Sequence, residues 1–489
     1  MMNEQLQNSS LRAGTARREI TTQDTKRNVI DPLYVKVLLL DDGKKQVAII
    51  AMDALAIGGI GDLSDDFLPT LRTRIETELH IPASHVLVNA SHTHPPGKIL
   101  RDEGEVIKST FDAVNEALQN LVPVKIGCGA GMEDRISMNR NLTLKSGKHW
   151  TIRHANPCPP DEDVVSVGPI DPEIGIVRVD RLDGTPLALV YNFAVHLLFA
   201  DPQASVTANI PGVASKIIEE TLGNGALAFF LQGAAGDIID VGFKDFEKPR
   251  EIETFGNRLA ISTLQAWKKI QTDDANLQVI SETIRLPRRT DIPRRIEDSR
   301  REQDALLQTL RGTSLNFHSF LSMYLKQQLN PDFPADYSYA YLQAEKIQNE
   351  TPREMDIITQ ELTSKYLRNI RVMERLALIQ DDIATLQRHQ EINRESGEQT
   401  IEAEIMGVKI GDCVLITAPI EILTEVSLNI KSTSPHKSTF MAAFTNGYMH
   451  YGPPASYYDK GGYEVTECLL APEWEKLYTK TAKEIIAKL

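Results

Sequence analysis

The stretch His85-Val-Leu-Val-Asn-Ala-Ser-His-Thr-His-Pro-Pro-Gly97 decides how the rest of the chain is interpreted. Its apolar run, 86–88, predicts a buried strand, and the Pro-Pro-Gly sequence that follows stops regular structure. Residues two apart on a strand point to the same side, so His92 and His94 are expected to face one cavity. Open α/β sheets bind their ligands at strand ends, which makes this a candidate site. A pair of loop histidines held by hydrogen bonds is the alternative, and the rest of the chain decides between the two.

Composition narrows the class of protein. With 489 residues, 42% of them hydrophobic and 25% charged, the chain is typical of a globular protein with two domains or one large domain with an insertion. No apolar run reaches the roughly 18 residues of a transmembrane helix. Residues 1–10 have neither the basic nor the apolar segment of an export signal, so a cytoplasmic protein is expected. The net charge of −14 argues against nucleic acid as a partner.

The cysteines form no recognisable motif. Four are present, without a Cys-x-x-Cys pair, which argues against a zinc finger and against a disulfide scaffold. Reduced thiols are therefore expected.

Alternating strand and helix patterns predict an α/β fold, with a mixed sheet core flanked by helices. The predicted strands lie at 11–20, 31–40, 46–53, 86–88, 187–195, 226–231, 402–410, 413–417, 418–423 and 440–444. The predicted helices of this core lie at 63–80, 103–121, 211–222 and from 472 to the end. The segment 145–172 is rich in Pro, Asp and Gly, which predicts a surface loop.

A second region begins at about residue 293, where Glu, Arg, Gln and Leu dominate and apolar residues recur at helical spacing. Helices are predicted at 294–310, 315–329, 338–348 and 352–389, with Gly397 marking the end. The chain thus divides into a discontinuous domain, 1–292 with 399–489, and a helical insertion, 293–398. An apolar stripe from Ile358 to Ile383 must be buried against the other insertion helices, the core or a second subunit, so a homodimer through this insertion is one expectation.

Polar side chains follow several of the predicted buried strands. They are His92, His94, His196, Asp237, Glu421 and the turn 446–451. Imidazole and carboxylate are zinc ligands, and two histidines with one carboxylate form a catalytic set that leaves a position open. Taken singly, each is more simply a core histidine or a helix-terminal charge. Their coincidence at several strand ends favours a metal site.

Nine short segments carry a resemblance to a known family. They are Arg12-Ala-Gly-Thr-Ala-Arg-Arg-Glu-Ile-Thr21, Asp31-Pro-Leu-Tyr34, Ser91-His-Thr-His-Pro95, Asn139-Arg140, Asn192-Phe-Ala-Val-His196, Gly233-Ala-Ala-Gly-Asp237, Pro419-Ile-Glu421, Asn446-Gly-Tyr-Met-His-Tyr451 and Gly461-Gly-Tyr-Glu464. In this order they resemble the N-terminal catalytic domain of the neutral/alkaline ceramidase family, and they cover most of the chain outside the helical insertion.

The resemblance implies a zinc-dependent hydrolase that acts on a small-molecule substrate through a metal-activated water. It implies one Zn²⁺ per chain, and the implied ligands are His92, His196, Glu421 and Tyr451. It also implies that His94 and Arg140 contact the substrate or its developing oxyanion, that Asp237 is the general base, and that Tyr463 is a second tyrosine of the pocket.

Three features depart from the family and favour a bacterial ceramidase-like amidase over a true ceramidase. Ile239 stands where ceramidases carry a serine associated with the ceramide head group, and isoleucine donates no hydrogen bond. From the position of Leu489 and from residues 1–10, we also expect neither the family's C-terminal immunoglobulin-like domain nor an export signal. We therefore expect cleavage of an amide or ester bond in a small metabolite.

Other functions stay open. A true ceramidase and a zinc enzyme acting on a lactone, on a glycoside or as a lyase are enzyme alternatives, and a metal-binding scaffold is the non-enzyme alternative. Asp237 and Arg140 favour an enzyme, because a purely structural zinc site needs neither.

Overall fold

The structure, a computed structural model, describes residues 11–153, 158–198, 205–241, 252–335 and 337–489. It divides into two compact units, Met1–Arg289 with Gly397–Leu489 (the core unit) and Thr290–Ser396 (the helical unit). The N-terminal stretch 1–10, on which the prediction about export rests, lies outside the described residues. Among the described helices, none is both long and apolar enough to cross a membrane.

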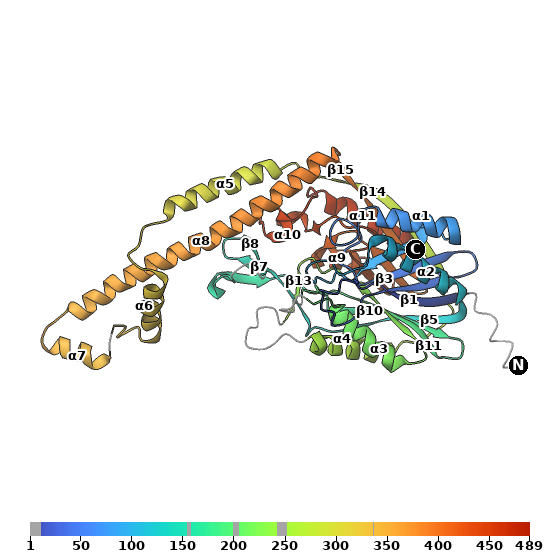
Figure 1. Cartoon of the computed structure of the whole chain (residues 1–489), viewed down its shortest axis with the longest axis horizontal. Helices are drawn as coiled ribbons and strands as arrows, with labels where there is room; N and C mark the ends of the chain where they lie inside the picture. Colours follow the sequence, from blue (N-terminus) through green and yellow to red (C-terminus); the bar gives the residue numbers. More distant parts are fainter. Residues whose placement is uncertain (1–10, 154–157, 199–204, 242–251, 336) are drawn as a thin grey trace. The chain divides into compact units, whose positions relative to one another are not determined.

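An eight-stranded mixed sheet is the base of the core unit (Figure 1), with the strand order β12-β11-β10-β5-β1-β2-β3-β4. Its strands are β1 (Arg12–Glu19), β2 (Tyr34–Asp41), β3 (Gln46–Met52), β4 (Val86–Ala90), β5 (Val122–Met132), β10 (Glu173–Arg181), β11 (Pro186–Phe193) and β12 (Leu227–Gln232). The outermost pairs, β11 with β12 and β3 with β4, are parallel, whereas the inner pairs are antiparallel. The predicted α/β class with a mixed sheet is confirmed.

A four-stranded sheet packs against one face of the large sheet. Its strands, in the order β14-β15-β16-β18, are β14 (Leu277–Pro287), β15 (Thr400–Ile410), β16 (Cys413–Thr417) and β18 (Ser438–Ala442). Leu38, Ile49 and Val190 of the large sheet share one buried cluster with Val408 and Leu415 of the small sheet. Burying each such side chain contributes about 1.5–3 kcal/mol, so this interface is a principal source of stability.

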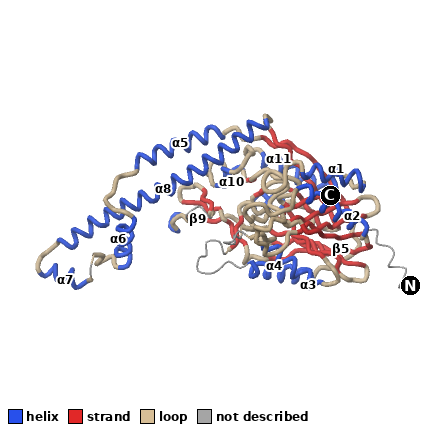
Figure 2. The backbone as a smooth tube through the Cα atoms, in the orientation of Figure 1, coloured by secondary structure: helices blue, strands red, loops and turns tan. Residues whose placement is uncertain are grey.

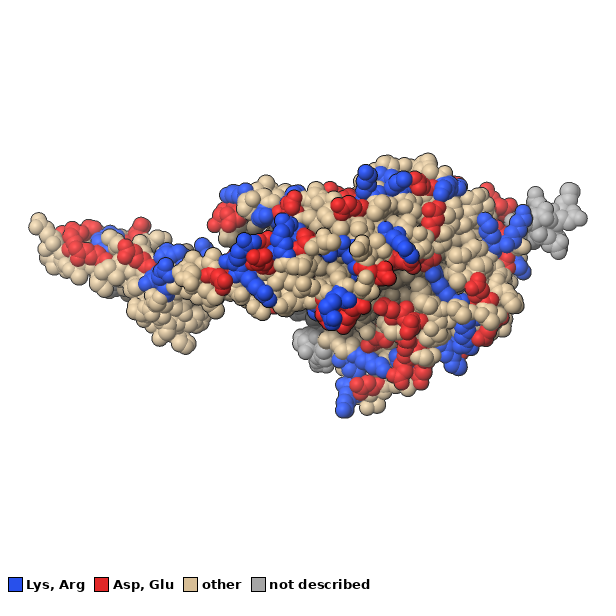
Figure 3. Space-filling view, turned by 90° about the horizontal axis from the view of Figure 1, so that it is seen from above, with Lys and Arg blue, Asp and Glu red and all other residues tan. Residues whose placement is uncertain are grey.

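Helices cover the outer faces of both sheets (Figure 2). The large sheet is covered by α1 (Phe67–Leu79), α2 (Glu103–Gln119), α3 (Asn209–Leu222) and α4 (Ile252–Trp267), and the small sheet by α9 (Thr424–Ser432) and α11 (Trp474–Lys488). The core unit is therefore layered as helix, sheet, sheet and helix. Acidic and basic side chains are interspersed over the face that Figure 3 shows.

A disulfide joins the two sheets. It links Cys128 of β5 to Cys413 of β16, with the Cα atoms 5.9 Å apart, while Cys158 and Cys468 take part in no disulfide among the described residues. The expectation that all four thiols are reduced is therefore wrong for this pair. The spacing of the cysteines gave no signal, because partners separated by 285 residues meet only when the two sheets pack.

Further short strands of the core unit form small sheets of two or three strands. The segment predicted as a surface loop instead contributes β8 (His149–Thr151) and β9 (Val164–Val167), which flank β7 (Asn141–Leu144) in a three-stranded sheet. Two further pairs are β6 (Ser137–Asn139) with β13 (Ile238–Asp240), and β17 (Glu421–Ile422) with β19 (Tyr451–Gly452). The second pair sets Glu421 directly opposite Tyr451.

The helical unit contains α5 (Ile292–Thr309), α6 (Phe317–Leu329), α7 (Ser338–Lys346) and α8 (Thr351–Ser396). All four helices were predicted, from composition and, for α8, from apolar residues at helical spacing. Gly397 follows α8 with φ of 64°, a left-handed conformation that glycine adopts without steric cost and that ends a helix. Ile292 and Ile296 of α5 pack on Ile379, Ile383 and Leu386 of α8.

The apolar stripe of α8 is only partly covered. Leu376 and Ile383 are buried, but Ile358 is 48% exposed and Met373 is 56% exposed. A homodimer through this stripe remains a prediction. Sedimentation velocity should find a dimer that Ile358→Glu with Met373→Glu dissociates, while Gln360→Glu on the same helix leaves it intact. A monomeric unmutated chain would contradict the prediction.

Candidate metal centre

The ends of β4, β11 and β12 are held together by polar side chains from the strands themselves. Asn89 Oδ1 accepts from the backbone N–H of Gln232 at 2.9 Å. The Gln232 side-chain amide donates to Ser91 O at 3.0 Å and to Val195 O at 2.6 Å. Ser91 and Val195 are the residues immediately before His92 and His196. Gln232 therefore positions both histidine-bearing segments relative to each other.

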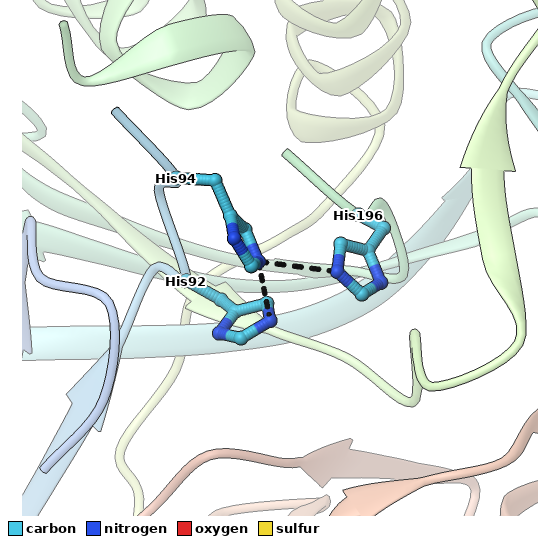
Figure 4. Close-up of side chains that lie close together, drawn as sticks. All are labelled: His92, His94 and His196. Carbon is cyan, nitrogen blue, oxygen red and sulfur yellow. Dashed lines mark hydrogen bonds between the residues drawn. The ribbon is translucent and has the colours of Figure 1, made fainter. Parts of the chain in front are cut away.

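Three histidines converge at these strand ends (Figure 4). The Nε2 atom of His94 lies 2.8 Å from that of His92 and 3.2 Å from that of His196. His92 and His196 are buried, and His92 has φ of 65°. That left-handed conformation is uncommon for a residue other than glycine, and such backbone strain concentrates at functional sites.

Hydrogen bonds fix the tautomers of two of these rings. His92 Nδ1 lies 2.7 Å from Leu55 O, and His196 Nδ1 lies 3.0 Å from Ala235 O. Because a carbonyl only accepts, each Nδ1 carries the proton and each Nε2 presents a lone pair to the centre of the cluster. Burial lowers the pKa of His94 and His196 well below the ordinary value for histidine, which favours neutral rings. A backbone carbonyl behind Nδ1 is the support that metal-binding histidines commonly have.

Glu421 of β17 brings a carboxylate to the same place. Its Oε2 lies 3.6 Å from His92 Nε2 and is buried without a hydrogen-bond partner among the described residues. Its Oε1 accepts a hydrogen bond from the Tyr448 hydroxyl. Burial opposes ionisation, but His92, His196 and the Tyr448 hydrogen bond hold the pKa of Glu421 below its usual range. The donor set, imidazole nitrogens with one unpaired carboxylate oxygen, fits zinc.

Arg140 lies at a second, adjoining cluster. It forms a buried ion pair with Glu464, with 2.9 Å between Nε and Oε1. Its Nη2 donates to Gly236 O at 2.7 Å and to the Tyr451 hydroxyl at 3.1 Å. Tyr463 packs edge-on against Tyr451, with ring centroids 5.4 Å apart. Nη1 of Arg140 takes part in none of these hydrogen bonds and retains its donors.

Tyr451, expected as a fourth ligand, lies between the two clusters. It stands opposite Glu421 across the β17–β19 pair, and its hydroxyl accepts from Arg140. Burial and the nearby Glu421 raise the pKa of Tyr451 well above the ordinary phenol value. It is Tyr448 that contacts the carboxylate of Glu421 directly.

Asp237 is connected to these clusters through its backbone. Its carbonyl accepts from the Arg140 backbone N–H at 2.8 Å. Its carboxylate accepts from the N–H and hydroxyl of Thr424, at 2.9 and 2.8 Å, and from the Asn139 amide at 2.7 Å. Thr424 is the first residue of α9, so the carboxylate lies at a helix N-terminus. Burial raises the pKa of Asp237.

Sequence reasoning did not single out three residues that contact the candidate site: Gln232, Tyr448 and Glu464. Tyr448 and Glu464 stand inside segments that were recognised, but pattern alone did not distinguish them from their neighbours. Gln232 ends a buried apolar strand, which is the same signal that identified the histidines.

No protein-family model matches the chain, and no curated protein matches its sequence. Solved structures similar to it include two ceramidases. One is neutral ceramidase from Pseudomonas aeruginosa, with a TM-score of 0.61, 13% identity, and coverage of 97% of this chain and 74% of the other. The second is a ceramidase complexed with C2, with a TM-score of 0.59, 13% identity and the same coverage. At this identity, the likeness shows that the chain shares the ceramidase fold.

Proposed function

We propose that the protein is a zinc-dependent hydrolase that cleaves an amide or ester bond in a small molecule at the cluster of His92, His94, His196 and Glu421. The observation that carries this proposal is the buried Glu421 Oε2, unpaired beside imidazole lone pairs. Hydrogen-bond acceptors that face one another in a buried site destabilise the folded protein unless a cation lies between them. The fold shared with ceramidases supports hydrolysis as the reaction class.

The residues around the cluster have chemical roles in this proposal. His92, His196, Glu421 and Tyr451 would hold the ion. Bound zinc supplies Lewis acidity and lowers the pKa of water from 15.7 toward roughly 7. The free Nη1 donors of Arg140 would bind the carbonyl oxygen as it gains negative charge. That arrangement favours an enzyme over a metal-binding scaffold.

The remaining roles concern protons and substrate contact. His94, between the two other rings, would donate a hydrogen bond to the substrate. Asp237 would act as the base, and Tyr463 would close the pocket beside Tyr451.

Metal content is the direct test. Purified protein should contain one zinc ion per chain, His92→Ala and His196→Ala should lose most of it, and Tyr451→Phe should lose less, because a neutral phenol is a weak ligand. Elemental analysis measures the ratio, with His85→Ala, whose Nδ1 contacts Gln46 O outside the cluster, as the matched control. Full zinc occupancy in His196→Ala would contradict the site.

Ceramide is the second candidate substrate, because both similar structures are ceramidases. Ile239, a buried residue of β13, argues for a different acyl compound. A substrate hydroxyl buried without a partner costs about 1–3 kcal/mol, or roughly five- to 150-fold in kcat/KM.

Short- and long-chain ceramides in detergent should therefore be cleaved less efficiently than the best member of a panel of small N-acyl compounds, esters and lactones. Ile239→Ser should weaken that preferred activity, while Val241→Ser, at an exposed position of the same segment, should not. Ceramide turnover above the whole panel would overturn the preference for a small metabolite.

A further inference from the structure

A cavity lies in the core unit, and the three clustered histidines are not among its described lining residues. It has a volume of about 750 Å³, and its walls are one face of β2 and β3, most of the length of α3, and β12. Tyr34, Lys36 and Asp53 line the strand face, and Met52 and Phe230 supply apolar surface. Ser91 also lines it.

Two polar groups in this cavity have hydrogen-bonding capacity that the described residues do not use. The Ser91 hydroxyl is buried, with the residue 3% exposed, and forms no hydrogen bond with a described residue. Asp53 uses one carboxylate oxygen, Oδ2, to accept from the Tyr34 N–H at 2.9 Å. Its other oxygen accepts nothing from the described part of the chain. Buried polar groups are nearly always hydrogen-bonded, so an unpaired hydroxyl beside a half-used carboxylate points to a ligand.

The other two carboxylates inside the cavity, Glu219 and Asp31, already accept hydrogen bonds from the protein. Glu219 accepts from Lys36 at 2.6 Å and from Arg17 at 3.1 Å. Asp31 accepts from the Thr207 hydroxyl at 2.5 Å and from the Ala208 N–H at 2.7 Å.

The lining as a whole holds four carboxylates and three basic side chains. Lys216 and Glu220 are exposed at the rim and opposite in charge. Asp31 and Asp53 are in no ion pair among the described residues, but both oxygens of Asp31 accept hydrogen bonds, so Asp53 is the carboxylate with an oxygen left for a ligand.

We propose that this cavity binds a small molecule with a primary ammonium group, which pairs with the Asp53 carboxylate and donates a second hydrogen bond to the Ser91 hydroxyl. Its carbon chain lies against Met52 and Phe230. A partly buried carboxylate with an oxygen that accepts no hydrogen bond attracts a cation because less water screens the pair than at the surface. This site is independent of zinc and of the proposed hydrolysis.

Binding at this site depends on pH with a defined sign. Burial raises the pKa of Asp53 to about 7; Lys36 opposes this shift, and Asp31 and Glu219 reinforce it. Tyr191, which also faces this group, stays neutral because burial raises its pKa. The ammonium ion binds the ionised carboxylate, so its affinity is full above the pKa of Asp53 and falls by about tenfold for each pH unit below it.

Titration of the full chain with n-butylammonium, followed by NMR or calorimetry, tests the proposal. We expect saturable binding that n-butanol and butyrate do not reproduce, and that weakens from pH 8 to pH 6. Asp53→Asn should reduce the affinity at least tenfold, and Ser91→Ala severalfold. Glu105→Gln, at an exposed position outside the cavity lining, should leave it unchanged.

His196→Ala should also retain binding, which separates this site from an amine bound to metal. Unchanged affinity in Asp53→Asn, equal binding of n-butanol, or no saturable binding would overturn the proposal. Melting temperatures identify a variant that has lost its fold, and in that case the pH dependence of the unmutated protein decides.

Discussion

Replacing Cys128 and Cys413 together by serine is expected to lower the free energy of unfolding by up to about 5 kcal/mol. The disulfide joins residues 285 positions apart, and a cross-link that closes so long a loop removes much of the entropy of the unfolded chain. It also fastens β5 to β16, across the interface of the two sheets. Urea unfolding of the oxidised protein, compared with the double variant, measures the effect.

Cys158→Ser is the matched control, because Cys158 is exposed and free. It should leave stability unchanged. Thiol titration of the unfolded, unreduced protein should find two reactive thiols, Cys158 and Cys468, and reduction should reveal all four. Four reactive thiols before reduction would contradict the disulfide. Disulfide bonds are typical of oxidising compartments, whereas a cytoplasmic protein was expected to keep its thiols reduced.

Asp237→Asn is expected to lower turnover by about 10²–10⁴-fold while zinc and fold are retained, if Asp237 is the base. The substitution removes the charge and the basic oxygen but keeps the size of the side chain. Kinetics on the best substrate of the panel, together with elemental analysis, measure both properties. Loss of zinc would make Asp237 a ligand instead of a base.

Thr424→Val separates catalysis from anchoring. It removes the hydroxyl that donates to Asp237 at 2.8 Å but keeps the backbone hydrogen bond to the same oxygen. If the carboxylate only anchors the start of α9, both variants should lose about 1–3 kcal/mol of stability and keep near-normal turnover in the folded fraction. If Asp237 is the base, Asp237→Asn should lose turnover and Thr424→Val should not.

Apolar spacing predicted the long helices well, because the helical unit follows local rules: steps of three and four along α8, with a glycine at its end. It failed at β5, where Gly127, Gly129 and Gly131 interrupt the strand pattern. Tertiary contacts require glycine at these positions. A Cβ at Gly127 would lie 2.1 Å from Gln271 O, and one at Gly129 would lie 2.7 Å from Ile270 Cγ1. The requirement comes from the segment that follows α4, which no local pattern of β5 can reveal.

The candidate metal centre was also only partly predictable from local sequence. The sequence pointed to His92, His94 and His196, because a polar residue that follows a buried strand is a local signal. The partners that decide their chemistry, such as Leu55 O behind His92, Ala235 O behind His196 and the Tyr448 hydroxyl on Glu421, depend on how loops return to the sheet. Family resemblance named several residues here, but it did not supply their hydrogen bonds.

The placement of Glu421 has a consequence for biosynthesis. His92, His94 and His196 precede the helical unit in the sequence, whereas Glu421, Tyr448 and Tyr451 follow it. A chain that leaves the ribosome N-terminus first presents the imidazoles long before the carboxylate, and such non-local closure is a late event. A nascent chain lacks the carboxylate half of the centre until translation is nearly finished. If the proposed metal binds here, its full set of ligands is available only late in synthesis, and chains that terminate before Glu421 lack a complete centre.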